Sequence, residues 1–369
     1  MTPSEARALL LQEINERRTY LHSHPETMNI EFSDVCHMNP PCTYCVGKNT
    51  PGYREYGDVT DEQLAKYWPS MLRARRVNDC TYGELQLYAG HERVIERLAE
   101  AGVRFGFTTT GQLLTANRSR FLIARADTVE FAVSLNAATA QTYKRYHGDG
   151  FDLVIRNLRR FMDLHRELRP GGALPLSLSY IVMRGNRHEV FAFLELASSL
   201  GINRVSLRHL FDLRAGAYRV DSFGYQFCYE QERMDYSGYL SLRSEIEAEP
   251  AFDHLNIHYQ WQPEQSFIQE QAEEGVDIPC LFPWKFLSIR PLHDSYTPCC
   301  FLKSSIALPS QTTVEEVWNG EILVGMRTEL AAGKIPHFCR TYGVACPLVL
   351  ASFRSEPTVP VLHQIAAID

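Results

Sequence analysis

The sequence predicts an α/β protein, a partial TIM-like (β/α)6 barrel followed by a small C-terminal metal domain. Six strand-like segments alternate with helical ones between Met28 and Phe211, and such alternation indicates a parallel sheet with right-handed crossovers. Six units are too few for a closed barrel of eight, so we expect an open barrel. Most of the ten cysteines lie in two groups, one near each end of the chain, which in a chain of this length favours metal or redox chemistry over disulfides.

The expected elements follow one another in a regular order. An N-terminal extension, residues 1–27, begins with a helix over Ser4–Arg18. The strands of the barrel are expected over 28–35, 77–83, 103–111, 128–137, 173–183 and 204–211. The helices between them are expected over 61–76, 92–102, 117–126, 153–168 and 189–201. Gly102 and Gly201 end two of these helices, where a left-handed residue is common.

The barrel is expected to span residues 28–211, and two further regions follow it. Residues 212–266 combine a loop rich in glycine, arginine and aromatic residues with a connecting helix at about Tyr236–Ala248. A loop of this length is more often functional than a mere connector. Residues 267–369 carry the C-terminal cysteines among prolines, glycines and short helical pieces, and we interpret them as the metal domain.

The composition limits the classes of partner. Lys and Arg number 37 and Asp and Glu number 44, so the net charge is −7, which is unfavourable for a protein that binds nucleic acid by neutralising phosphates. The chain contains no run of about 18 apolar residues, so no membrane span is predicted. The start of the chain does not resemble a secretory signal. We therefore expect a cytoplasmic protein that binds neither nucleic acid nor membranes.

Three cysteines follow the first expected strand directly, in the pattern Cys36-x5-Cys42-x2-Cys45. Active sites of βα sheets lie at the carboxyl ends of the strands. Three thiolates can hold three irons of a [4Fe–4S] cube and leave the fourth iron open to a small molecule. The alternative is a zinc site completed by a distant ligand, for example His37.

This pattern resembles the radical S-adenosylmethionine (radical SAM) superfamily. That family has a cysteine triad after the first barrel strand, usually C-x3-C-x2-C, with an aromatic residue before the third cysteine. Tyr44 stands in the aromatic position, whereas the first spacer is longer here. Three further motifs occur in the family's order over residues 28–350, namely Tyr82-Gly83-Glu84 for Gly-Gly-Glu, Thr109-Thr110-Gly111 for Thr-Asn-Gly, and Ser134-Leu135-Asn136 for Ser-Leu-Asp.

The resemblance implies a role for each of these motifs. The backbone of Tyr82 and Gly83 and the carboxylate of Glu84 would hold the methionine ammonium of SAM. Tyr44 would offer its face and backbone near the adenine, and Ser134 and Asn136 would offer polar groups to the ribose or the carboxylate. Taken singly, each residue has another interpretation: Glu84 as a helix cap, Ser134 and Asn136 as strand-ending residues, and Tyr44 as a packing aromatic.

The second cysteine group resembles the auxiliary-cluster extension of radical SAM enzymes, the SPASM domain or its shorter twitch form. The family signature C-x9-15-G-x4-C corresponds to Cys280-x13-Asp294-x4-Cys299, with Asp294 in the glycine position. The resemblance implies one auxiliary [4Fe–4S] cluster, held by Cys280, Cys299, Cys339 and Cys346. Cys300 competes with Cys299 for the ligand position, and a zinc site made of the same four residues is the alternative.

Two cysteines lie outside both groups. Cys80, on the second strand, is expected to be a small buried apolar side chain. Cys228, in the aromatic loop, has the more open setting and is a candidate hydrogen donor to a substrate radical.

The resemblance also implies the chemistry. One electron from the reduced cube, supplied by a flavodoxin- or ferredoxin-type donor, cleaves SAM, and the 5′-deoxyadenosyl radical removes hydrogen from a C–H bond. If the auxiliary cluster takes an electron from the substrate radical, the outcome is oxidation. If a thiol returns hydrogen to the opposite face, the outcome is epimerisation.

The substrate expected from this resemblance is a small polar metabolite, such as a sugar or an aminocyclitol, because only about 27 residues precede the barrel and leave no room for a peptide-recognition domain. Candidate substrate contacts at strand ends are His91, Arg184, Arg208 and His209, although each could instead form a salt bridge across the barrel. Modification of a ribosomally made peptide is the alternative reaction. A non-enzymatic iron–sulfur electron carrier or a zinc-stabilised binding module is the alternative of another class.

Overall fold

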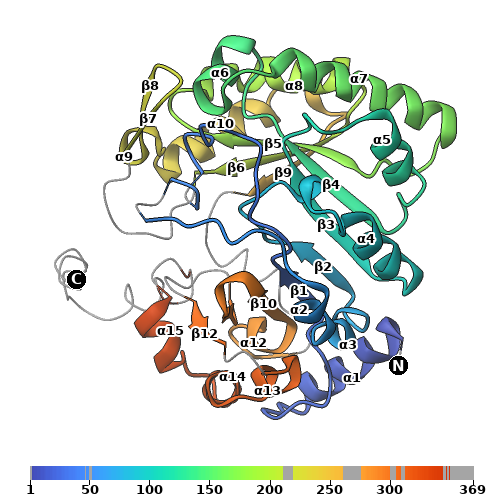
Figure 1. The fold of residues 1–369 in the computed structure, drawn as a ribbon. Helices are drawn as coiled ribbons and strands as arrows, with labels where there is room; N and C mark the ends of the chain where they lie inside the picture. Colours follow the sequence, from blue (N-terminus) through green and yellow to red (C-terminus); the bar gives the residue numbers. More distant parts are fainter. Residues whose placement is uncertain are drawn as a thin grey trace, which may run out of the picture.

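The computed structural model describes residues 2–45, 47–49, 52–210, 219–260, 276–299, 305–308, 312–343, 346 and 349. Within these residues one mixed sheet of ten strands curves around the centre of the molecule, in the order β12-β11-β10-β1-β2-β3-β4-β5-β6-β9 (Figure 1). All neighbours from β10 through β9 pair in parallel, whereas β10, β11 and β12 pair antiparallel.

The strands of this sheet are β1 (Thr27–Ile30), β2 (Arg76–Asp79), β3 (Arg104–Thr109), β4 (Val129–Ser134), β5 (Leu176–Val182), β6 (Arg204–His209), β9 (Asn256–Gln260), β10 (Phe286–Arg290), β11 (Ser295–Thr297) and β12 (Ile306–Ala307). A separate antiparallel hairpin is formed by β7 (Arg219–Ser222) and β8 (Tyr225–Cys228). Strands β1 to β6 lie side by side in chain order, which confirms the predicted open six-stranded barrel.

The described helices are α1 (Pro3–Asn15), α2 (Asp61–Ala65), α3 (Trp68–Met71), α4 (His91–Glu100), α5 (Ala116–Ile123), α6 (Ala140–His147), α7 (Phe151–Leu168), α8 (Val190–Ser199), α9 (Tyr229–Glu232), α10 (Tyr236–Glu247), α12 (Phe282–Lys285), α13 (Val314–Trp318), α14 (Glu321–Ala331) and α15 (His337–Tyr342). Short 3-10 turns are η1 (Leu85–Leu87), η2 (Arg187–Glu189), η3 (Pro250–Phe252) and η4 (Pro291–His293). Helices α4 to α8 cover the outer face of the barrel sheet (Figure 1).

The prediction of one continuous helix over residues 61–76 is wrong. The single helix over 61–76 is divided into α2 and α3. A capping box of Thr60 and Gln63 begins α2, whereas Pro69 lies in the first turn of α3, where its missing N–H leaves no hydrogen bond unmade. The proline therefore starts a second short helix instead of continuing the first.

Two parallel strands that the sequence analysis did not anticipate extend the barrel at its edges. Strand β9 pairs with β6, from within the segment expected to hold only a loop and a helix. Strand β10 pairs with β1, so that Met28 lies opposite Leu287. The C-terminal region therefore continues the barrel sheet and is not a separate layer.

A buried ion-pair cluster fastens this junction. Glu31, which directly follows β1, is fully buried, and its two carboxylate oxygens lie 2.9 Å from Arg290 and 2.9 Å from His293. Breaking such a pair by removing one partner leaves a buried charge without compensation. Glu31 therefore couples the start of the cluster loop to β10.

The N-terminal extension packs against the C-terminal helices, more than 260 residues away in sequence. The indole N–H of Trp284 donates to the Arg18 carbonyl at 2.8 Å, and Arg327 donates to the Thr19 carbonyl at 3.1 Å. Asn319 and Leu21 exchange two hydrogen bonds of 2.8 Å each. These bonds satisfy backbone groups of the turn after α1 that have no partner within a helix.

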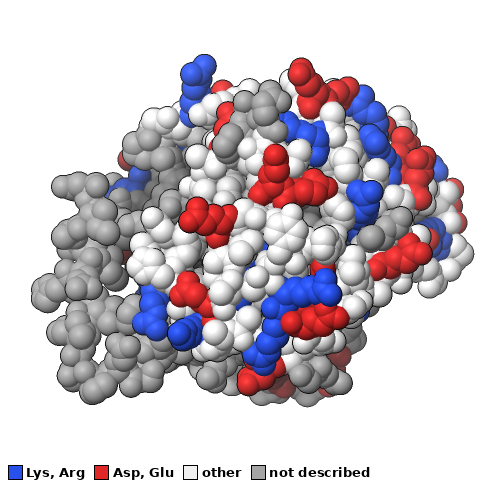
Figure 2. Space-filling model, turned by 90° about the horizontal axis from the view of Figure 1, so that it is seen from below, with Lys and Arg blue, Asp and Glu red and all other residues white. Residues whose placement is uncertain are grey.

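Charges on the outside are mixed in sign. On the face shown in Figure 2, acidic and basic side chains alternate in small groups among uncharged residues. Among the described residues, no helix is both long and apolar enough to cross a membrane.

Candidate functional site

The first cysteine group, Cys36, Cys42 and Cys45, lies in the loop that leaves β1, and the structure brings its thiols together. Burial raises the pKa of Cys42 and of Cys36, and repulsion from neighbouring thiolates raises both further. Such thiols ionise when a metal replaces the proton's charge. Within the described residues no three His, Cys, Asp or Glu side chains converge on one ion position. The thiolates of a cube bind separate irons and need no such convergence, so this donor set fits a cluster.

Buried polar contacts hold the cluster loop in place. The Asp34 carboxylate accepts hydrogen bonds from the Tyr53 hydroxyl and the Gly57 amide, each at 2.8 Å. The Asn49 side chain donates to the Cys42 carbonyl at 2.8 Å. Because Asp34 is fully buried, these bonds are sheltered from water, and the loop is anchored on both sides of the cysteines.

Glu84 lies beside this loop, at the carboxyl end of β2. Its carboxylate accepts from the backbone N–H and the hydroxyl of Thr110, at 2.8 and 3.0 Å, and its own backbone N–H donates to the Val35 carbonyl at 2.8 Å. The charge of Glu84 also raises the pKa of Cys36, after burial. The capping interpretation applies as well, since Glu84 accepts from the Gln86 N–H at the start of η1.

The other two residues of this motif have clear steric roles. A Cβ on Gly83 would lie 2.5 Å from the Val35 carbonyl oxygen, so a side chain cannot fit there. The Tyr82 ring packs against Gly47, where a Cβ would lie only 2.4 Å from the ring. The Arg290 guanidinium lies 4.9 Å from the centre of the Tyr82 ring. Tyr82 therefore links the cluster loop to β10, which explains how this chain accommodates tyrosine where the family has glycine.

Tyr44, Ser134 and Asn136 meet at the carboxyl end of β4. The Asn136 amide donates to the Tyr44 oxygen at 2.7 Å and lies 2.9 Å from the Ser134 oxygen. Asn136 has a positive φ of 54°, which asparagine tolerates better than most residues. The residues predicted from the motifs thus form one hydrogen-bonded group next to the cluster loop.

His147, at the end of α6, joins this group and was not found by sequence reasoning. Its Nδ1 lies 3.3 Å from the Cys42 sulfur, and its Nε2 lies 3.1 Å from both the Tyr44 oxygen and the Asn136 amide nitrogen. Burial lowers the pKa of His147 to about 3, so the ring is neutral near pH 7 and carries one N–H. The available signal was weak: Tyr143 and His147 share one face of the helix, and their rings stack at 4.5 Å.

The hydrogen-bond partners of His147 are compatible with a proton on Nδ1. The Ile181 N–H donates to Asn136 Oδ1 at 2.7 Å, which orients the amide so that its NH2 faces Tyr44, Ser134 and His147. With the proton on Nδ1, Nε2 can accept from the Tyr44 hydroxyl or the Asn136 amide. In this tautomer the Nδ1–H is a donor for the Cys42 sulfur, which as a thiolate can only accept.

We predict that His147→Phe lowers the reduction potential of the N-terminal cluster. The reduced cluster carries more negative charge, so an N–H donor to its sulfur favours reduction. We expect a shift on the order of 50 mV, since about 59 mV corresponds to 1.4 kcal/mol for one electron. An EPR-monitored redox titration measures it. Tyr143→Phe, which keeps the stacked ring and the Nδ1–H, is the control, and equal potentials in all three proteins would contradict the assigned donor.

The second cysteine group, Cys280, Cys299, Cys339 and Cys346, is also brought together. Burial raises the pKa of Cys280 and of Cys339, and the charges of the other group members raise both further. Phe282, Phe286 and Phe338 pack in one cluster with Cys280, Cys299 and Cys346. Cys299 is buried and the other three cysteines are partly buried, and four such thiols suit a cluster whose ligand positions are all filled by the protein.

Asp294 has a left-handed backbone conformation, with a φ of 41°. It stands where the family signature has glycine, and left-handed positions favour glycine, with aspartate among the few alternatives. The tight turn at η4 therefore reverses the chain between β10 and β11, which carries Cys299 back toward Cys280.

Four residues named in the sequence analysis remain. Cys300 lies outside the described residues. Cys80 is partly buried, and its sulfur lies 3.9 Å from the Ser288 hydroxyl. The expectation of an open setting for Cys228 is wrong, because its side chain is 5% exposed at the end of β8. Both ring nitrogens of His37 are buried with no hydrogen-bond partner among the described residues.

The four strand-end candidates for substrate contact differ in whether they line the barrel cavity. His91 contacts the Tyr88 carbonyl, Arg184 donates to the Arg233 carbonyl, and His209 contacts the Gln260 carbonyl. Each of these three side chains thus makes at least one hydrogen bond to a nearby backbone carbonyl. Arg208 alone of the four lines the barrel cavity.

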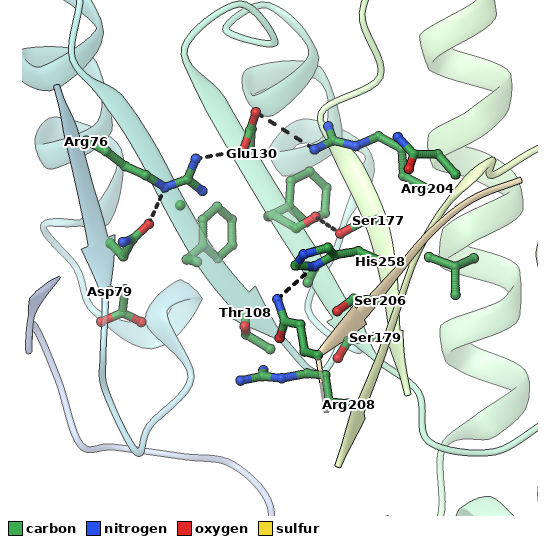
Figure 3. Close-up of a pocket in the computed structure, with 18 residues that line it drawn as sticks. Arg76, Asp79, Thr108, Glu130, Ser177, Ser179, Arg204, Ser206, Arg208 and His258 are labelled. Atoms are coloured by element: carbon green, nitrogen blue, oxygen red, sulfur yellow. Dashed lines mark hydrogen bonds and ion pairs between the residues drawn. The ribbon is translucent and has the colours of Figure 1, made fainter. Parts of the chain in front are cut away.

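The barrel encloses a cavity of about 670 Å³, lined by strands β2 to β6 and β9 (Figure 3). This volume is typical of small-molecule sites. Arg76 and Arg204 share Glu130 at the amino ends of the strands, at 2.9 and 3.8 Å. At the carboxyl ends lie Arg208 and Asp79, the latter with a pKa raised to about 7 by burial. The cavity is therefore polar along its length, with the cluster loop at its carboxyl end.

Comparison with known proteins agrees with this architecture. No protein-family model matches the chain. A probable GTP 3′,8-cyclase of Saccharolobus islandicus is 33% identical over 200 residues, covering 52% of this chain and 59% of the relative. The chain thus spans about three fifths of the length of the curated relatives it matches.

Solved structures share the fold at low sequence identity. Streptococcus suis SuiB bound to precursor peptide SuiA superposes with a TM-score of 0.65 and 14% identity, over 88% of this chain and 71% of SuiB. The structure of anSMEcpe with bound AdoMet gives a TM-score of 0.59 and 12% identity, over 89% of this chain and 91% of that protein.

An open parallel barrel with a cysteine loop after its first strand places the chain in the partial-barrel class of α/β folds. Over about half of its length the chain is also similar in sequence to the probable GTP 3′,8-cyclases. The fold class predicted from the sequence is confirmed.

Proposed function

We propose that this protein cleaves SAM reductively and removes hydrogen from a C–H bond of a small polar metabolite, such as a sugar or an aminocyclitol. The observation that carries the proposal is that motifs far apart in sequence meet at one end of the barrel, beside a polar cavity. The N-terminal [4Fe–4S] cluster, when bound, supplies the electron for this cleavage. A flavodoxin- or ferredoxin-type protein is the proposed donor to the cluster.

The chain's own residues bind and orient the reactants in this proposal. Cys36, Cys42 and Cys45 hold the cluster, and the Glu84 carboxylate binds the methionine ammonium. Tyr44, Ser134 and Asn136 present an oriented polar group to the rest of SAM. A substrate that fills the cavity would displace water from it, which protects a radical from side reactions.

The second cysteine group supports an oxidative outcome. Its four thiols suit one auxiliary [4Fe–4S] cluster, which would accept an electron from the substrate radical and so give oxidation. Epimerisation instead requires a thiol that returns hydrogen. Cys228 was the sequence-based candidate, and its burial at the end of β8 disfavours direct access to the cavity.

A nucleotide is the second candidate substrate, because the curated relatives at 33% identity are named probable GTP 3′,8-cyclases. Their match covers 52% of this chain. A cavity of about 670 Å³ has room for a nucleotide as well as for a sugar.

The test is formation of 5′-deoxyadenosine. We expect the anaerobically reconstituted, dithionite-reduced protein to convert SAM to 5′-deoxyadenosine, measured by liquid chromatography and mass spectrometry. A pure electron carrier or a zinc module would form none. With candidate substrates, a product two hydrogens lighter indicates oxidation, whereas a product one mass unit heavier in deuterium oxide and unchanged in water indicates epimerisation. Modification of a peptide with every small metabolite left intact would contradict the proposed substrate class.

A further inference from the structure

One arginine in the barrel cavity has no anionic partner. Of the three arginines that line the cavity, Arg76 and Arg204 share Glu130. Arg208 makes no hydrogen bond or ion pair with any described residue, and no dashed line reaches it in Figure 3. Arg208 is solvent-exposed where it lines the cavity.

A second polar group on the same strand is also unsatisfied. The Ser206 hydroxyl is buried without a hydrogen-bond partner among the described residues. Residues two apart on a strand point to the same side of the sheet, and both Ser206 and Arg208 line the cavity (Figure 3). A buried hydroxyl without a partner is costly. Together with the unpaired guanidinium of Arg208 in the same cavity, it indicates a place that a ligand completes.

The surroundings suit an anion attached to a hydroxylated molecule. Thr108, Ser179 and Gln260 line the same cavity and offer hydroxyl and amide groups. The two carboxyl-bearing residues of the cavity do not neutralise Arg208, because Glu130 is shared by the other two arginines and Asp79 has a pKa raised to about 7. Guanidinium groups bind carboxylates and phosphates through paired N–H bonds.

We propose that Arg208 and Ser206 form an anion subsite on β6, which binds a carboxylate or phosphate group of the substrate. The inference rests on the proposed function, and it narrows the substrate class to hydroxylated metabolites that carry such a group. Arg208 lies at the carboxyl end of β6, the same end of the parallel strands at which the cluster loop leaves β1, so the subsite faces that loop. An anion bound there holds the rest of the molecule inside the barrel, next to the SAM site.

Matched pairs of probes test the proposal. Glucose is compared with glucose 6-phosphate and glucuronate, and guanosine with guanosine 5′-monophosphate, by calorimetry on the reconstituted holoenzyme with SAM. We expect an anionic member to bind at least tenfold more tightly than its neutral partner. Arg208→Gln should weaken that binding by roughly 10–150-fold, the range for a hydrogen bond to a charged group. Arg204→Gln, in the same cavity but paired with Glu130, is the control and should keep the preference.

Binding of SAM and of the probes is measured separately, because the methionine carboxylate of SAM is another possible anion. We expect Arg208→Gln to leave the dissociation constant of SAM unchanged. Loss of SAM affinity without loss of anion preference, or no anion binding by the wild-type protein, would overturn the inference. If 5′-deoxyadenosine is still formed, only the anion subsite fails; if it is not, the proposed function fails as well.

Discussion

Replacement of Cys36, Cys42 and Cys45 together by alanine is expected to abolish SAM cleavage and to halve the iron content. Two cubes correspond to about eight irons and eight sulfides per chain after anaerobic reconstitution, so about four of each should remain. The remaining cluster is the one assigned to the second cysteine group, three of whose members pack among phenylalanine rings. Iron and sulfide assays, together with EPR of the reduced protein, measure the change.

Controls for this experiment come from the same chain. Cys80→Ala removes a thiol that belongs to neither group and should leave about eight irons. Cys280→Ala combined with Cys339→Ala should instead keep about four irons and retain SAM binding. A protein that takes up two zinc ions and negligible iron would refute both assignments.

Glu84→Gln should lower the affinity for SAM by roughly 10–150-fold without changing the iron content. The substitution removes the charge that would bind the methionine ammonium, and a charge-assisted hydrogen bond contributes about 1.5–3 kcal/mol. Glutamine is preferred to alanine because the carboxylate also accepts two bonds from Thr110. The amide oxygen can still accept from Thr110, so the turn is retained. Equilibrium binding of SAM to the reconstituted protein measures the effect.

Glu189→Gln is the matched control for Glu84. Its carboxylate likewise accepts from a threonine hydroxyl, Thr139 at 2.6 Å, and from a backbone N–H, Ala138 at 2.8 Å. A purely structural role for Glu84 predicts that both variants lose similar thermal stability and that neither changes SAM affinity. An unaltered dissociation constant in Glu84→Gln would therefore remove Glu84 from the SAM site.

The tertiary structure explains the departures from the family motifs through particular contacts. Tyr82 is tolerated in place of glycine because its ring packs against Gly47 and lies under Arg290. Asp294 is tolerated because aspartate can adopt the left-handed conformation required there. Neither compensation is visible in the sequence, since Gly47 and Arg290 are separated from Tyr82 by 35 and 208 positions along the chain.

The sequence by itself determined the order of the six βα units and the two sets of cysteines, because alternation and short spacings are local properties of the chain. Only the tertiary structure decided that β9 and β10 extend the barrel, since those pairings join distant segments whose own patterns are too short to read. The same holds for His147, which reaches Cys42 across 105 positions. The sequence around Arg208 was equally compatible with a salt bridge across the barrel. The fold leaves it facing the cavity because the one glutamate there lies at the opposite end of the strands, between Arg76 and Arg204.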